Sequence, residues 1–125
     1  MSKLFLSATA LVISTIPAFA DVTAGALAAG TWARGDGNAK VRITQCGASL
    51  CAVNTWIRNP GSEKVGDKLI LNVKKTGGNT FEGTAFDPQR NLNLSSKIVV
   101  NGDRMTTSGC VLGGLLCKTA QWTRE

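Results

Sequence analysis

Residues that favour tight turns recur at short intervals after Gly30, and this spacing limits the length of every regular element between them. The turn segments combine Gly, Pro, Asn and Asp, which accept the backbone angles that tight turns require. They are RGDGN at 34–38, GASL at 47–50, NPGS at 59–62, TGGN at 76–79, DPQR at 87–90 and NG at 101–102. Short segments between such turns are typical of β-strands joined as hairpins.

The segments between the turns alternate apolar and polar residues, which is the pattern of strands with one wet face. In KVRITQ, Val41 and Ile43 share one face, and in KLILNVK the same holds for Leu69, Leu71 and Val73. We expect eight strands, at Thr31–Arg34, Lys40–Cys46, Cys51–Ile57, Lys68–Lys74, Thr80–Phe86, Asn91–Val100, Asp103–Gly109 and Lys118–Arg124. Eight strands at hairpin spacing predict an all-β fold, a small antiparallel up-and-down barrel, with a two-sheet sandwich as the alternative.

The first twenty residues have the features of a cleaved secretory signal peptide. Lys3 provides a positive charge, residues 4–16 are mostly apolar, and Ala18 and Ala20 form an A-x-A cleavage site. The apolar stretch is shorter than the ~20 residues of a membrane-spanning helix, so we expect no integral membrane anchor. We therefore expect a signal peptide at 1–20, a lead-in segment at 21–29 with room for a helical turn, and one exported barrel domain at 30–125.

The chain has four cysteines, and in an exported protein an even number indicates disulfides. Three pairings are open. Each close pair flanks one expected hairpin turn, so we predict the local disulfides Cys46–Cys51 and Cys110–Cys117. A four-cysteine zinc site is the alternative, but the C-x4-C and C-x6-C spacings are wider than those of common zinc sites, so we expect no metal.

Closure of the barrel requires its first and last strands to pair. The first expected strand contains GTWAR and the last ends in AQWTRE. In that arrangement the guanidinium of Arg124 can lie over the ring of Trp32 as a cation–π contact. We therefore assign barrel closure to Trp32 and Arg124.

The composition argues against an enzyme. The chain has no His and no Tyr, which removes the commonest general base and the Ser–His and Cys–His nucleophile pairs. Most acidic residues lie in or beside expected turns, where Asp commonly forms the turn; these are Asp36, Glu63, Asp67, Asp87 and Asp103. We expect no catalytic residue and no cofactor.

The excess of positive charge does not indicate a nucleic-acid partner. Loss of Lys3 with the signal peptide lowers the net charge from +6 to +5, and Lys74 and Lys75 are the only adjacent basic pair. Surfaces that bind single-stranded nucleic acid interleave aromatic and basic residues. Here the aromatic residues after the signal peptide are dispersed along the chain, at Trp32, Trp56, Phe81, Phe86 and Trp122.

Two functions fit a small exported barrel of this kind. In the first, inward side chains line a cavity for one small apolar ligand, and the alternative for these side chains is that they fill the barrel. The candidate lining residues are Val41, Ile43, Val53, Leu69, Leu71, Phe81, Leu92, Leu94, Ile98 and Met105. In the second, the protein associates with the envelope and acts through its basic outer surface on a partner that the sequence does not identify.

Several stretches are similar to a known bacterial family. GTW at 30–32 is similar to the Gly-x-Trp that opens lipocalin-like barrels, and the wider pattern includes KVRITQCGASLCAVNTWIRNP at 40–60, FEGTAFDP at 81–88 and GCVLGGLLCKTAQWTR at 109–124. Together they resemble the exported family called domain of unknown function 2147. The resemblance implies a small lipocalin-like barrel in the periplasm with no established activity.

Overall fold

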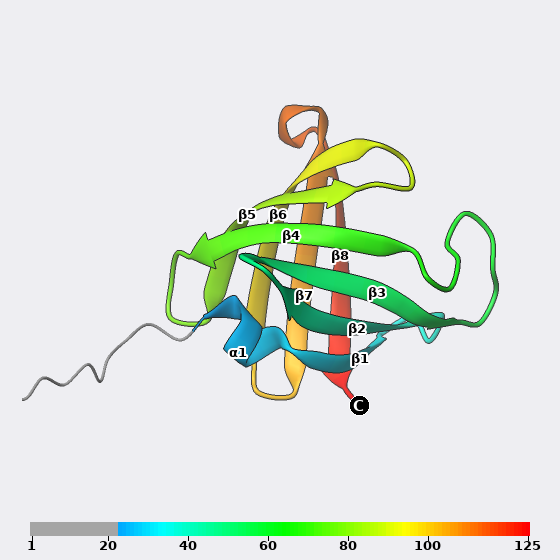
Figure 1. The fold of residues 1–125 in the computed structure, drawn as a ribbon, viewed down its shortest axis with the longest axis horizontal. Coiled ribbons are helices and arrows are strands. Elements are labelled where there is room, and N and C mark those ends of the chain that lie inside the picture. The colour runs from blue at the N-terminus through cyan, green and yellow to red at the C-terminus, as the bar shows by residue number, and fades with distance from the viewer. Residues whose placement is uncertain (1–22) are drawn as a thin grey trace, which may run out of the picture.

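The computed structural model describes residues 23–125, so the expected signal peptide at 1–20 lies outside the described part of the chain. In this described part, one short helix precedes eight strands, and a single 3-10 turn interrupts them before the last strand (Figure 1). The elements are α1 (Ala24–Ala28), β1 (Gly30–Arg34), β2 (Ala39–Cys46), β3 (Ser49–Ile57), β4 (Lys68–Lys75), β5 (Thr80–Asp87), β6 (Leu92–Asn101), β7 (Arg104–Val111), η1 (Leu112–Gly114) and β8 (Leu116–Arg124).

The eight strands form a closed antiparallel barrel in the order β1 to β8. Each strand pairs with the next along the chain, and β1 closes the barrel against β8 through Trp32↔Arg124, Ala33↔Thr123 and Arg34↔Trp122. The predicted up-and-down barrel is therefore confirmed, and the sandwich alternative is wrong. Closure leaves the sheet without a fully unpaired first or last strand, although β1 is only five residues long.

The turns use the residues that the sequence pattern indicated. Gly102 joins β6 to β7 with a positive φ of 61°, which a glycine adopts without a steric cost. Asn91, which ends the DPQR turn between β5 and β6, has φ 52°, and Asn is among the few other residues that tolerate this region. Each tight turn sets the register between the two strands that it joins.

The core lies in the half of the barrel that α1 covers. Trp32, Phe81, Ile98 and Met105 are its largest fully buried side chains. Phe81 and Met105 sit at the starts of β5 and β7, on the side where α1 packs against the ends of β2 and β4 (Figure 1). The lead-in segment thus forms a short helix that caps one end of the barrel.

Two disulfides staple two of the hairpins. Cys46–Cys51 spans the β2–β3 turn and Cys110–Cys117 spans the β7–β8 turn, with Cα atoms 5.8 and 4.0 Å apart. Both predicted pairings are confirmed. Because each staple links neighbouring strands, it fixes the end of a hairpin and ties no distant parts together.

Candidate functional site

Helix α1 is held on the barrel by Trp32 and Arg124. The indole N–H of Trp32 donates to the carbonyl of Ala28 at 2.8 Å, and the Trp32 side chain is fully buried. The Arg124 guanidinium lies 4.2 Å from the centroid of the Trp32 ring. It also donates to the carbonyls of Ala29 and Leu27 at 2.8 and 2.9 Å. The expected cation–π contact is present, and the same two side chains bind the end of the helix.

Glycine at position 25 allows the helix to approach the barrel closely. A Cβ at Gly25 would lie 2.1 Å from Oε1 of Gln45, near the end of β2. The Gln45 amide in turn donates to the carbonyl of Gly47 at 2.8 Å, which fixes the side chain beside the β2–β3 turn. The hydroxyl of Thr23 accepts from the Ala26 N–H at 3.1 Å and caps the start of α1. The helix position is therefore set at both of its ends.

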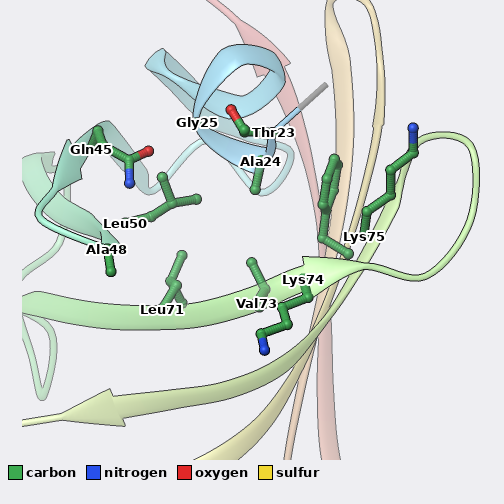
Figure 2. Close-up of a pocket in the computed structure, with 11 residues that line it drawn as sticks. Thr23, Ala24, Gly25, Gln45, Ala48, Leu50, Leu71, Val73, Lys74 and Lys75 are labelled. Carbon is green, nitrogen blue, oxygen red and sulfur yellow. The ribbon is translucent and has the colours of Figure 1, made fainter. Parts of the chain in front are cut away.

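A pocket of about 490 Å³ lies between α1, the β2–β3 turn and the end of β4 (Figure 2). Its apolar floor comes from the barrel, where Leu50 and Leu71 are paired in register across β3 and β4. Figure 2 shows Leu71 and Val73 pointing from β4 towards α1. The lining residues are Thr23, Ala24, Gly25, Gln45, Ala48, Leu50, Leu71, Val73, Lys74, Lys75 and Phe81.

The rim of this pocket is polar and positively charged. Lys75 rises from the end of β4 on the same side as Val73, whereas Lys74 points to the other side of the strand (Figure 2). Gln45 and Thr23 add amide and hydroxyl groups, and none of the residues that line the pocket is acidic. The site thus combines an apolar floor with a cationic edge.

The side chains that the sequence assigned to a central cavity mostly fill the barrel. Six of them are buried in the core, namely Val41, Ile43, Leu71, Phe81, Ile98 and Met105. Leu69 and Leu94 are partly buried and pack against that core. Only Leu71 and Phe81 of the assigned set reach the pocket.

Two of the assigned lining residues are placed wrongly by the sequence reasoning. Val53 lies on the outer face, because it is paired with exposed Arg42 while its neighbour Ala52 is paired with buried Ile43. The inward alternation of β3 starts at Leu50, one residue before the strand predicted at Cys51–Ile57, and continues at Ala52. Leu92 is 39% exposed because it is the first residue of β6, at the end of the barrel away from α1.

Most of the residues that line the pocket are not predicted from the sequence. The sequence pattern places Leu50 in a turn, yet it is 3% exposed and forms part of the floor. Ala24 and Gly25 belong to the lead-in segment, which had no assigned role in a site. The run of small residues in AGALAAG was the available signal, since small residues permit close packing of a helix on a sheet.

At the end of the barrel away from α1, two carboxylates form ion pairs with an arginine. Arg34 binds Glu63 through two hydrogen bonds of 2.6 and 2.8 Å, and its Nε lies 3.0 Å from Asp36. Hydrogen bonds from Arg34 hold the pKa values of both Glu63 and Asp36 below their usual range. The bond to Glu63 is also the main cause that raises the pKa of Arg34.

A second ion-pair cluster surrounds the turn between β5 and β6. Asp87 accepts from Arg90 at 2.8 Å and from the Gln89 amide at 2.7 Å. Burial raises the pKa of Asp87, but these hydrogen bonds together outweigh burial, so the pKa of Asp87 is lowered. Carboxylates held in this way stay ionised near neutral pH and stabilise loops.

Two common kinds of site are absent from the described residues. Within residues 23–125, no group of three or more cysteine or acidic side chains is arranged to hold a metal ion. Over the same range, no helix has the length and apolar character to cross a membrane.

Comparison with known proteins agrees with the fold. The chain is similar to the solved structure of a redesigned β-barrel, with a TM-score of 0.54 and 14% sequence identity over 82% of this chain and 95% of that one. At this identity the likeness concerns the fold alone. No curated protein matches the chain in sequence.

A family model identifies the group to which the chain is related. The model describes an uncharacterised protein conserved in bacteria, DUF2147, and it matches residues 30–124. The match spans all eight strands of the barrel and agrees with the resemblance that the sequence motifs indicated. The protein therefore belongs to the DUF2147 family of bacterial proteins.

Proposed function

We propose that this protein is a non-enzymatic periplasmic binding module that holds one small amphipathic molecule in the pocket beneath α1. The observation that carries the proposal is the combination of an apolar floor with a cationic rim in a pocket of about 490 Å³. Ligand pockets are usually about 300–1,000 Å³, mostly apolar, with a few polar groups that orient the ligand.

The pocket favours a ligand with an apolar chain and an anionic or strongly polar end. The chain would lie over Leu50, Leu71 and Phe81, where it removes apolar surface from water. The polar end would face Gln45 and Lys75 at the rim. A molecule of this type would gain binding free energy both from the apolar floor and from the polar rim of the pocket.

The packing of the barrel core places the proposed ligand at the end of the barrel and not at its centre. The barrel interior near α1 holds Trp32, Ile98 and Met105, each at most 2% exposed, so a ligand at its centre would have to displace them. The pocket at the edge of α1 requires no such displacement. Two further features support a binding role over catalysis: the absence of His and the ion pairing of Glu63 and Asp87.

The test uses the mature protein and two probes of equal chain length, dodecanoate and dodecanol, below the concentrations at which they aggregate. We expect both to shift the amide NMR signals around Leu50, Leu71 and Phe81 in a saturable way, and dodecanoate to bind more tightly. The Ala48→Trp variant should weaken both by tenfold or more, because the indole occupies the pocket from an exposed turn position.

The matched control is Thr84→Trp, which adds the same ring at an exposed position on β5 outside the pocket. This variant should bind as the unmodified protein does. The proposal is wrong if neither probe gives saturable shifts, or if Ala48→Trp and Thr84→Trp affect binding equally. Native mass spectrometry of protein purified from its own cells should also detect a co-purified small molecule.

A further inference from the structure

One edge of β8 is open along half of the strand. β8 pairs with β7 from Leu116 to Thr123, but β1 reaches only Trp122–Arg124. A hydrogen bond of 2.7 Å from the Gly35 N–H to the Gln121 carbonyl extends this contact by one residue. Figure 1 shows the β7–β8 hairpin rising at the top of the view, with its turn beyond the ends of the other strands. Among residues 23–125, the segment Leu116–Ala120 therefore has a paired strand on one side only.

The backbone of this segment presents hydrogen-bonding groups to the open side. The Gln121 carbonyl points towards β1, and the groups of alternate residues in a strand point the same way. The Cα atoms of Cys110 and Cys117 are 4.0 Å apart, which is the close spacing of a pair that exchanges no ladder hydrogen bonds. Both observations place the N–H and C=O groups of Cys117 and Thr119 on the open edge.

The side chains beside this edge are exposed and of two kinds. Leu116 is 60% exposed and Leu115, in the adjacent turn, is 82% exposed. Lys118 is also exposed, and its charge adds a small contribution to the lowered pKa of Glu63, although no carboxylate in the described residues lies within ion-pair distance of its ammonium. Leu116 and Lys118 share one face of the strand, because they are two residues apart. The edge thus carries an apolar group and a cation at a spacing that one strand can match.

A second copy of the chain fits this edge poorly. Antiparallel pairing that uses the groups of Cys117 and Thr119 is centred on Lys118, so each Lys118 would lie directly opposite its equivalent. Like charges at directly opposed positions destabilise a strand pair. A register centred on Thr119 would instead need the Gln121 carbonyl, which already accepts from Gly35. A register centred on Cys117 would pair Thr119 with Leu115, which lies in the turn before β8 and outside the strand.

We propose that the open edge of β8, from Leu116 to Ala120, binds an extended peptide segment of another protein by strand addition. In this mode the backbone hydrogen bonds provide affinity and alternate side chains provide specificity. In antiparallel pairing, the residue opposite Lys118 would be Asp or Glu, and the residue two positions later would be apolar and contact Leu116. The charge of Lys118 selects this segment and disfavours self-pairing.

The test titrates the mature protein with a capped heptapeptide of alternating Thr and Val that carries one Glu followed two residues later by Leu. We expect amide NMR shifts and slower hydrogen exchange at Cys117 and Thr119. A peptide with Lys in place of Glu should bind at least fivefold more weakly. The Lys118→Glu variant should reverse this preference, and Lys97→Glu, the same charge change at an exposed position on β6, should leave it unchanged.

A second variant separates backbone recognition from charge. Thr119→Pro removes one edge N–H and no backbone hydrogen bond to β7, and it loses only the 3.4 Å side-chain bond from the Thr119 hydroxyl to the Ser108 hydroxyl. It should therefore abolish peptide binding while the circular dichroism spectrum stays that of the barrel. Three results would each overturn the proposal: shifts centred away from Leu116–Gln121, equal effects of Lys118→Glu and Lys97→Glu, or a concentration-dependent dimer formed through this edge in sedimentation.

Discussion

Replacement of Arg124 by Ala should release α1 and destabilise the whole barrel. The guanidinium contacts the Trp32 ring at 4.2 Å and donates to the carbonyls of Leu27 and Ala29. A cation–π contact contributes about 0.5–2 kcal/mol, and hydrogen bonds with a charged partner contribute about 1.5–3 kcal/mol each where water is excluded. The Arg124 side chain is 30% exposed, so we discount the bonds and expect a total loss of about 2–4 kcal/mol in the free energy of unfolding.

Trp32→Ala should cost about 3–5 kcal/mol, because a fully buried ring leaves a cavity. Both side chains hold the end of α1, so the double variant should lose less than the sum of the two single losses. We expect a coupling of about 1–2 kcal/mol, within the range for residues in direct contact. If Trp32→Ala does not fold, Trp32→Phe retains most of the ring and still removes the N–H donated to Ala28.

The assay is urea unfolding followed by circular dichroism for the four proteins of the cycle, together with hydrogen exchange of the α1 amides. Arg104→Ala serves as the control, since Arg104 is exposed on β7 next to the same barrel end, and it should change stability by less than about 0.5 kcal/mol. Two results would refute the conclusion that Arg124 and Trp32 together hold α1 on the barrel. The first is strict additivity of the two losses in unfolding free energy, and the second is a loss for Arg124→Ala no larger than that of the control.

Three other changes test the packing and electrostatics of the barrel. Gly83→Ala should cost about 2–4 kcal/mol in urea unfolding, because its Cβ would lie 2.0 Å from the carbonyl oxygen of Asn72, whereas Gly109→Ala places a Cβ at an ordinary 3.7 Å and should be nearly neutral. The lowered pKa of Glu63 adds stability that is present above its unfolded value near 4.5 and is lost as the pH falls through the folded pKa, so Glu63→Gln should flatten the decline in stability measured between pH 5 and pH 2. Reduction of both disulfides should lower the unfolding free energy by about 2 kcal/mol for each short loop, and non-reducing peptide mapping should recover only the two local cross-links.

Local signals in the sequence determined the class of fold. Turn residues such as Gly102 and Asn91 act through their own backbone angles, which depend on no distant contact. Alternation in β2 and β4 reports which face of a strand is buried, and the cysteines that flank two turns are already neighbours along the chain. These features were sufficient to predict eight hairpin-linked strands, their closure at Trp32 and Arg124, and both disulfides.

The sequence was less informative where the register between two paired strands shifts. β2 and β3 change register between Lys40 and Val41, and β3 begins at Ser49, so alternation counted from the wrong residue placed Val53 inside. Leu92 has the right alternation, yet it lies at a barrel end where little covers it. Alternation indicates which face of the sheet a side chain is on. How deeply that side chain is buried depends on its position along the barrel and on the strands that cover it.

The candidate sites were decided by tertiary structure alone. The pocket exists because α1 crosses only part of the barrel end, and its walls come from α1, β3 and β4, which are far apart in the sequence. The open edge of β8 exists because β1 is shorter than the strand it pairs with. The strands, turns and disulfides could thus be predicted from the sequence, since the strands and turns follow from local backbone preferences and each disulfide joins cysteines that are close along the chain. Only the three-dimensional packing decided which surfaces stay uncovered, because that depends on the relative lengths and positions of elements that meet only in the folded barrel.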